Sequence, residues 1–166
     1  NGEFTVNIAL IEKHKPVLGI VHVPINSLTY IGCEGVGSKI YDPINGARRI
    51  SVKSNPGKTI RIVGSRSHRG NTLETFLGKI KNYELQPIGS SLKFCVVAEG
   101  NADLYPRLGP TSEWDTAAAQ AVVEQAGGLV LTTDGLQLQY NTKQDILNPH
   151  FFVIGSHKLQ NLFIEK

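Results

Sequence analysis

The spacing of apolar residues changes once along the chain. In the first third, apolar and polar residues alternate in short runs that are separated by turn residues such as His14-Lys15-Pro16 and Glu34-Gly35. A period of two is typical of strands in an antiparallel sheet. The sequence therefore predicts strands over four segments: Phe4–Leu10, Val17–Val23, Leu28–Cys33 and Val36–Tyr41.

Beyond the turn-forming segment Ser54–Lys58, strand-like and helical segments alternate. Leu73, Phe76, Leu77 and Ile80 are three or four residues apart, which predicts a helix with one apolar stripe that packs on a sheet. The predicted helices are Asn71–Ile80, Ser90–Glu99, Ser112–Ala126 and a terminal helix from Ser156, and the predicted strands are Ile60–Gly64, a short one near Glu84, Ala102–Tyr105, Leu129–Leu131 and Phe151–Ile154. We expect residues 1–55 to be the end of an N-terminal antiparallel-sheet subdomain and residues 58–166 to form a C-terminal α/β subdomain.

The composition is that of a globular protein and narrows the range of partners. Of the 166 residues, 40% are hydrophobic and 19% are charged, and no apolar run approaches the roughly 18 residues of a transmembrane segment. The formal net charge is only +3, without a polybasic block, which argues against long nucleic acids but allows a small phosphorylated ligand. Cys33 and Cys95 lack metal-ligand spacing and are too few for a disulfide framework, which fits a reducing cytoplasm.

A candidate functional carboxylate lies near residue 115. Pro110 and Thr111–Asp115 predict a helix start, and the alanines that follow lead to Gly127-Gly128, which predicts its end. In the first helical turn, the helix dipole keeps Asp115 ionised, which suits a metal ligand or a partner for a substrate hydroxyl. Ser112-x-x-Asp115 is also an acceptable capping box, which is a structural role. The residues alone leave both roles open.

A second segment predicts an anion site. Gly89 and Ser90 open a predicted helix, with Ser90 as its cap, and the free backbone N–H groups at a helix start can bind an anion. Lys93 in the first turn adds a positive charge that gains nothing from the helix dipole, so an anion there would offset its placement.

Two further segments carry candidate ligand-binding side chains. Ser65 and His68 follow the strand Ile60–Gly64, at the carboxyl edge where α/β sheets usually bind ligands. Arg107 follows Tyr105-Pro106 and has the charge to meet a phosphate. The structural alternatives are a solvated histidine in a loop and a surface arginine in a turn.

These motifs resemble those of the inositol-monophosphatase-like, magnesium-dependent phosphatases. Trp114–Ala119 with Gly127-Gly128 is similar to the second signature of that family. Three stretches look like its 3′(2′),5′-bisphosphate nucleotidase branch of the CysQ type: Asn1–Leu10, Ser65–His68, and Gly89–Cys95 continuing to Ala102–Arg107. The resemblance covers essentially the whole chain and implies an α/β fold, the αβαβα sandwich of the family, here without its N-terminal part.

The family's first metal motif, D-P-[IL]-D-G-[TS], and a catalytic glutamate belong upstream of the segment that resembles Asn1–Leu10. We therefore expect the chain to be the C-terminal portion of a longer protein and, with an incomplete sheet, to be prone to aggregation when isolated. Asp42-Pro43-Ile44-Asn45-Gly46 looks like the metal motif, but Asn45 and Ala47 replace its second aspartate and its final hydroxyl residue. We interpret that segment as a turn.

The resemblance also implies an activity: Mg²⁺-dependent hydrolysis of the 3′-phosphate of adenosine 3′,5′-bisphosphate to AMP and phosphate. It implies that Asp115 is a catalytic metal ligand that also meets the substrate, and that six other residues bind substrate: Ser65, His68, Gly89, Ser90, Lys93 and Arg107. We expect this segment to supply a nucleotide-binding wall and one metal ligand, and to be inactive alone. The alternatives are an inositol phosphate phosphatase of the same fold and a non-catalytic nucleotide-binding module. The expected location is the cytoplasm, with peripheral attachment to the inner membrane as a variant, and the sequence indicates no oligomeric state.

Overall fold

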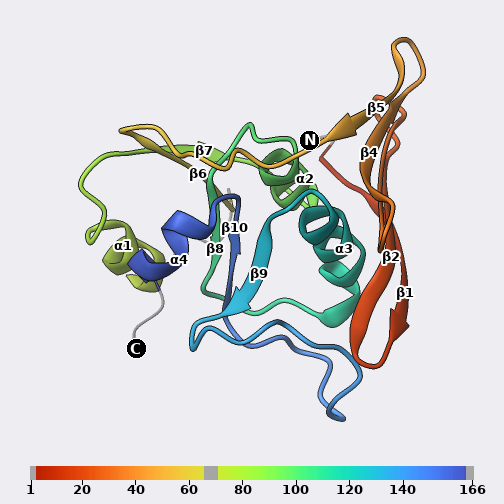
Figure 1. Cartoon of the computed structure of the whole chain (residues 1–166). Helices are drawn as coiled ribbons and strands as arrows, with labels where there is room; N and C mark the ends of the chain where they lie inside the picture. The colour runs from red at the N-terminus through yellow and green to blue at the C-terminus, as the bar shows by residue number, and fades with distance from the viewer. Residues whose placement is uncertain (1–2, 66–70, 164–166) are drawn as a thin grey trace.

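Two five-stranded sheets form the framework of the chain (Figure 1). The computed structural model describes residues 3–65 and 71–163. The first sheet, called here the meander sheet, is antiparallel and its strands follow one another in chain order. Its strands are β1 Val6–Glu12, β2 Lys15–Val23, β3 Leu28–Cys33, β4 Gly37–Asp42 and β5 Gly46–Ile50.

The second sheet is mixed and has the strand order β7-β6-β8-β10-β9. β6 runs parallel to β7 and β8, and β10 runs antiparallel to β8 and β9. Its strands are β6 Ile60–Gly64, β7 Tyr83–Pro87, β8 Leu104–Arg107, β9 Leu129–Thr132 and β10 Phe151–Ile154. The helices are α1 Asn71–Leu77, α2 Leu92–Ala98, α3 Ala117–Gln125 and α4 His157–Phe163, with a 3₁₀ turn η1 at Glu113–Asp115.

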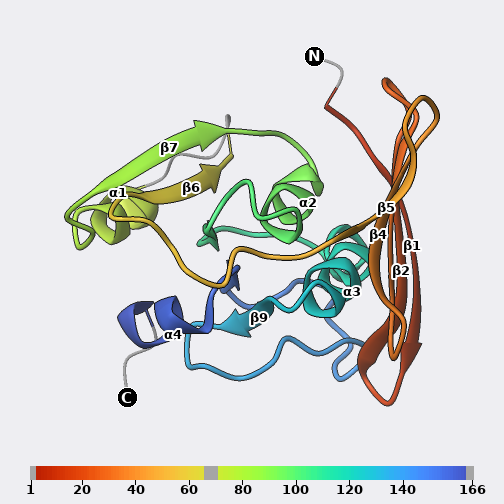
Figure 2. The same cartoon turned by 45° about the horizontal axis from the view of Figure 1, so that its top comes forward.

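The elements are stacked in four layers, sheet, helices, sheet, helices (Figures 1 and 2). α2 and α3 lie between the two sheets, and one hydrophobic core joins them, with Val21 and Tyr30 from the meander sheet and Phe151 and Val153 from the mixed sheet. α1 and α4 cover the other face of the mixed sheet, where Leu73 and Leu77 of the predicted stripe are buried. The layered α/β fold expected from the sequence is confirmed.

Two paired glycines let α3 lie directly on the meander sheet. Gly19 of β2 is paired with Gly32 of the neighbouring strand β3. A Cβ at Gly19 would lie 2.0 Å from the Ala118 carbonyl oxygen, and one at Gly32 would lie 2.5 Å from that of Ala121. The small residues at the start of α3 and these glycines therefore fit each other, and this contact fixes the helix that follows Asp115.

The other face of the meander sheet carries exposed apolar side chains. Val6, Ile8 and Leu10 alternate along β1 and are 51%, 61% and 58% exposed. None of the described helices covers this face, which forms the outer side of the sheet in Figure 2. Among the described residues, this face of the meander sheet is therefore uncovered.

The long helix predicted over Ser112–Ala126 is interrupted. η1 ends at Asp115 and α3 starts at Ala117, with Thr116 between them at φ −122°. The Thr116 hydroxyl donates to the Glu113 carbonyl and accepts hydrogen bonds from the buried Asn148 and Tyr140 side chains. Because these contacts come from a loop more than 20 residues away, local helix propensity does not reveal the break.

Other differences concern element ends and one strand. β5 was not predicted, since Ala47-Arg48-Arg49 shows no apolar alternation, and β8 ends at Arg107 rather than at Tyr105. The predicted turn before β5 is confirmed: Asp42 Oδ1 accepts the Ile44 N–H at 2.8 Å. Among the described helices, none is both long and apolar enough to cross a membrane.

An ion pair joins the strands that carry the site. Asp103, which is fully buried just before β8, accepts from Arg61 Nη2 at 2.7 Å and from Arg61 Nε at 3.0 Å. The Arg61 backbone N–H also donates to the same carboxylate at 2.9 Å. This two-pronged pair fixes β8 against β6, and so holds Arg107 and Ser65 at one edge of the sheet.

Candidate active site

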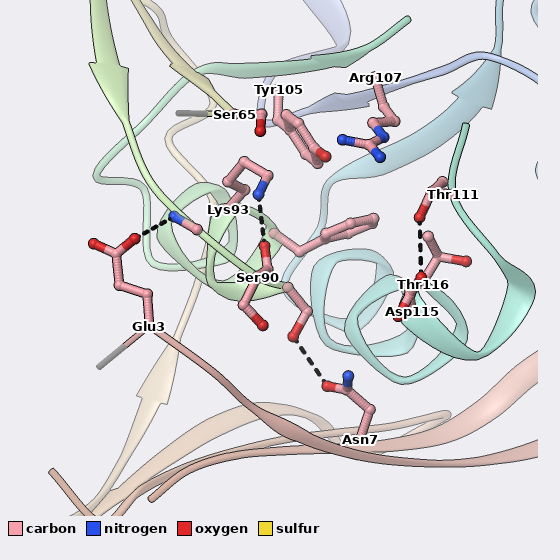
Figure 3. Close-up of a pocket in the computed structure, with 13 residues that line it drawn as sticks. Glu3, Asn7, Ser65, Ser90, Lys93, Tyr105, Arg107, Thr111, Asp115 and Thr116 are labelled. Atoms are coloured by element: carbon pink, nitrogen blue, oxygen red, sulfur yellow. Dashed lines mark hydrogen bonds between the residues drawn. The ribbon is translucent and has the colours of Figure 1, made fainter. Parts of the chain in front are cut away.

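Most of the predicted site residues meet at one pocket of about 370 Å³ (Figure 3). This volume lies within the range of about 300–1,000 Å³ typical of small-molecule sites. Six of the seven predicted residues line it: Ser65, Gly89, Ser90, Lys93, Arg107 and Asp115. His68 lies outside the described residues.

The pocket is built by elements from both sheets. Ser65 follows β6, Arg107 ends β8, and the loop before α2 contributes Gly89 and Ser90. The segment leading into β1 and the turn η1 close the remaining sides. Sequence reasoning missed seven lining residues as site residues: Glu3, Asn7, Ser91, Phe94, Tyr105, Thr111 and Thr116.

Asp115 presents an accessible carboxylate. Its side chain is exposed, and Oδ2 accepts from the Ser112 N–H at 3.3 Å and from the Thr111 hydroxyl at 3.4 Å. Both contacts are long, and the Ser112 contact is the one expected of a capping carboxylate. The structural and functional roles considered for Asp115 are therefore compatible, since Oδ1 has no described partner.

The loop before α2 differs from the predicted anion site. α2 begins at Leu92 with Ser91 as its cap, while Ser90 lies in the left-handed region at φ +54°. The Gly89 N–H is not free, because it donates to Glu3 Oε2 at 2.6 Å. The prediction that Ser90 caps the helix is wrong: Ser91 is the cap, and the Ser90 hydroxyl lies 2.7 Å from Thr5 Oγ1.

Lys93 is the buried cation of the pocket. Its side chain is only 5% exposed, and its ammonium donates to the Ser90 carbonyl at 2.7 Å and to the Ile88 carbonyl at 3.2 Å. The ammonium also lies 5.2 Å from the centre of the Tyr105 ring. Burial, with a smaller contribution from the nearby Arg107 charge, lowers the pKa of Lys93 to about 8.

Arg107 is the second cation. Its Nη2 donates to the Pro110 carbonyl, and its Nε is buried without a hydrogen-bond partner among the described residues. Burial raises the pKa of the neighbouring Tyr105 hydroxyl to about 12, and Arg107 opposes that rise. Lys93 and Arg107 thus place two positive charges at one pocket, where an anionic ligand would relieve their repulsion.

The described side chains fit one ligand of a magnesium site and not a complete site. Mg²⁺ prefers oxygen ligands in octahedral geometry, and the Asp115 carboxylate is of this kind. Among the described residues, no three acidic, histidine or cysteine side chains gather into a group that could hold a metal ion. The chain therefore offers Asp115 as a single carboxylate toward a shared metal site.

Comparison with known proteins defines the class. The whole chain, residues 1–166, matches the inositol monophosphatase family. The chain belongs to this family.

Within the family, the similarity extends to CysQ proteins. The chain is 46% identical over 153 residues to the "3'(2'),5'-bisphosphate nucleotidase CysQ" of Salmonella typhimurium, and 44% identical over 153 residues to that of Escherichia coli K12. These matches cover 92% of this chain and 61% of each relative. The chain thus spans about three fifths of the length of these curated relatives. The resemblance to the CysQ type expected from the motifs is confirmed.

Comparison with solved structures also supports the assignment to this family. The crystal structure of CysQ from Bacteroides thetaiotaomicron superposes with a TM-score of 0.86 at 39% identity, over 95% of this chain and 64% of that one. An inositol monophosphatase from Zymomonas mobilis superposes with a TM-score of 0.80 at 22% identity, over 99% of this chain and 62% of that one. The second match supports the fold alone.

Proposed function

We propose that the protein containing this chain hydrolyses the 3′-phosphate of adenosine 3′,5′-bisphosphate to AMP and phosphate with Mg²⁺. The observation that carries the proposal is that Lys93, Arg107 and Asp115 line one pocket in a chain 46% identical to a 3'(2'),5'-bisphosphate nucleotidase. The same proposal places the protein in the cytoplasm.

Each described side chain has a task that follows from its chemistry. Lys93 and Arg107 neutralise phosphate charge, and Arg107 can bind two phosphate oxygens with its planar guanidinium. Ser65, which follows β6 and lines the pocket, is assigned a contact with the nucleotide in this proposal. A bisphosphate carries two anionic groups, which matches the two cations of this pocket better than a single phosphate does.

Asp115 binds the metal ion and contacts the substrate. When bound, Mg²⁺ would supply charge neutralisation at the phosphate and a more acidic bound water. The exposed Asp115 carboxylate, held loosely by Thr111 and Ser112, remains free to ligate through Oδ1. Further carboxylates are required for that site, so the 166 residues on their own are expected to show negligible turnover.

The experiment compares two proteins and two substrates. The product of the whole open reading frame that encodes this chain, and the 166 residues alone, are assayed for phosphate release at pH 7 with and without Mg²⁺. We expect the first protein to hydrolyse adenosine 3′,5′-bisphosphate faster than inositol monophosphate, and only with Mg²⁺.

Each other outcome contradicts a defined part of the proposal. Preference for inositol monophosphate would assign the chain to inositol phosphate hydrolysis. Nucleotide binding without any phosphate release by the open-reading-frame product would make it a binding module. Mg²⁺-dependent turnover by the 166 residues alone would disprove the single-ligand role of this segment.

A further inference from the structure

The segment that leads into β1 has two different faces. Glu3, Thr5 and Asn7 point toward the loop before α2, whereas Phe4 and Val6 are exposed on the opposite side. This alternation is that of an extended strand. We call Glu3, Thr5 and Asn7 the N-terminal clamp; Figure 3 shows two of its members, Glu3 and Asn7, beside the loop.

The N-terminal clamp contacts every residue of the loop from 89 to 91. Glu3 Oε2 accepts the Gly89 N–H at 2.6 Å. Thr5 Oγ1 lies 2.7 Å from Ser90 Oγ and 2.8 Å from Ser91 Oγ. These contacts join residues more than 80 positions apart, so they fix the loop against another part of the fold.

The direction of the hydroxyl bonds follows from proton counting. Ser91 Oγ donates its single proton to Asn7 Oδ1, at 2.9 Å. Ser91 must then accept from Thr5, and Thr5 must accept from Ser90, because each hydroxyl carries one proton. The Ser90 hydroxyl proton and the Gly89 N–H are therefore both used by the N-terminal clamp.

Lys93 supplies a further hydrogen-bond donor for a ligand. Its ammonium has three protons, and the described acceptors are two, the carbonyls of Ile88 and Ser90. The Ser90 carbonyl is directed to Lys93 by the left-handed Ser90 backbone, which L-residues adopt only where surrounding contacts hold them. The third Lys93 proton can therefore point into the pocket.

We infer that the N-terminal clamp positions Lys93 for a phosphate group, by holding Gly89–Ser91 so that the Ser90 carbonyl anchors the ammonium. The inference rests on the proposed function and changes the role of two predicted substrate ligands. Gly89 and Ser90 act through Lys93, and the clamp residues are positioning residues that do not touch the ligand.

The test uses the product of the whole open reading frame and adenosine 3′,5′-bisphosphate. Thr5→Val removes the hydroxyl and keeps the shape, Thr5→Ser restores the hydroxyl, and Glu12→Ala is a control at the other end of β1. We expect Thr5→Val to raise KM about tenfold with kcat within about twofold, and Thr5→Ser to restore KM. Glu12→Ala should leave both constants unchanged.

Variants of Glu3 show whether its carboxylate positions the loop or competes with the phosphate for binding. If its carboxylate positions the loop, Glu3→Ala raises KM, and Glu3→Gln, which keeps an acceptor for the Gly89 N–H, does so less. A lower KM in Glu3→Ala would mean that the carboxylate competes with the phosphate, and would overturn the inference. An unchanged KM in both Thr5→Val and Glu3→Ala would also overturn it.

A second readout does not depend on catalysis. Titration of the Lys93 side chain by NMR reports the surroundings of its ammonium, which are Arg107, Tyr105 and Glu3. Loosening the loop in Thr5→Val should let water reach the ammonium and move its titration upward, toward the ordinary value. An unmoved titration overturns the inference, whereas failure of the unmodified protein to act on any phosphate ester would overturn only the proposed function.

Discussion

Replacing Lys93 with methionine is expected to stabilise the protein near neutral pH and to abolish its affinity for phosphate esters. Lys93 is buried, and its ammonium contacts two carbonyls and no described carboxylate. The fall of its pKa from 10.5 to about 8 corresponds to about 3 kcal/mol by which folding disfavours the charged form. Methionine has a similar length and carries no charge to bury.

The pH dependence of the free energy of unfolding measures this cost of burying the Lys93 charge separately from other effects of the substitution. Below pH 8 both the folded and unfolded states carry the Lys93 proton, and the full cost of about 3 kcal/mol is present. Between pH 8 and pH 10.5 the folded state loses the proton while the unfolded state keeps it, so the free energy of unfolding rises. The methionine variant lacks that rise. The two carbonyls that lose a donor lower its stability by an amount that does not depend on pH.

Urea unfolding followed by circular dichroism, at several pH values from 7 to 10, measures the difference directly. The advantage of Lys93→Met over the unmodified protein should shrink by about 2.5 kcal/mol across this range, because the unfolded state still carries part of its Lys93 proton at pH 10. Lys39→Met, at an exposed lysine on β4, is the matched control and should show no such trend. Parallel curves for Lys93→Met and the unmodified protein would refute the reasoning, because they would mean that the ammonium is hydrated in the folded state.

Three further changes test the metal ligand, the packing and the uncovered face. Asp115→Ala in the product of the whole open reading frame should lower Mg²⁺-dependent phosphate release at least about a hundredfold without altering the circular dichroism spectrum, and retained activity would remove Asp115 from the mechanism. Gly32→Ala should cost about 3 kcal/mol or more in urea unfolding, because its Cβ would lie 2.5 Å from the Ala121 carbonyl oxygen, while Gly57→Ala serves as a neutral control. Ile8→Lys should reduce light scattering by the isolated 166 residues, and unchanged scattering would show that the outer face does not drive association.

The sequence predicts the elements whose pattern is local. The stripe that contains Leu73 and Leu77 and the alternation along the first strands are fixed by period, and both are present in the structure. β5 is not predicted, because a strand at a sheet edge with two arginines has no apolar period. The helix break at Thr116 is not predicted for a different reason: it depends on contacts with Tyr140 and Asn148 in a distant loop.

The candidate site follows the same division. The resemblance of ordered motifs predicted the residues that line the pocket, including Lys93, Arg107 and Asp115. It did not predict which lining residues already have hydrogen-bond partners within the protein. The partners of Gly89 and Ser90 come from the segment before β1. Hydrogen-bond partners at such separation depend on the packing of two sheets, which no local pattern encodes.

The pocket also differs from the Asp103–Arg61 pair in whether its buried charged groups have partners of opposite charge. Elsewhere the buried charge of Asp103 is paired with Arg61, in a bond that satisfies both oxygens of its carboxylate. At the pocket, the buried Lys93 ammonium forms hydrogen bonds to two carbonyls and no ion pair with a carboxylate among the described residues, the Arg107 Nε is buried without a partner among them, and Ser90 is held in the left-handed region. Natural proteins concentrate such departures at functional sites. Since each departure here involves either a cation or the loop that anchors one, the ligand that would compensate them is an anion.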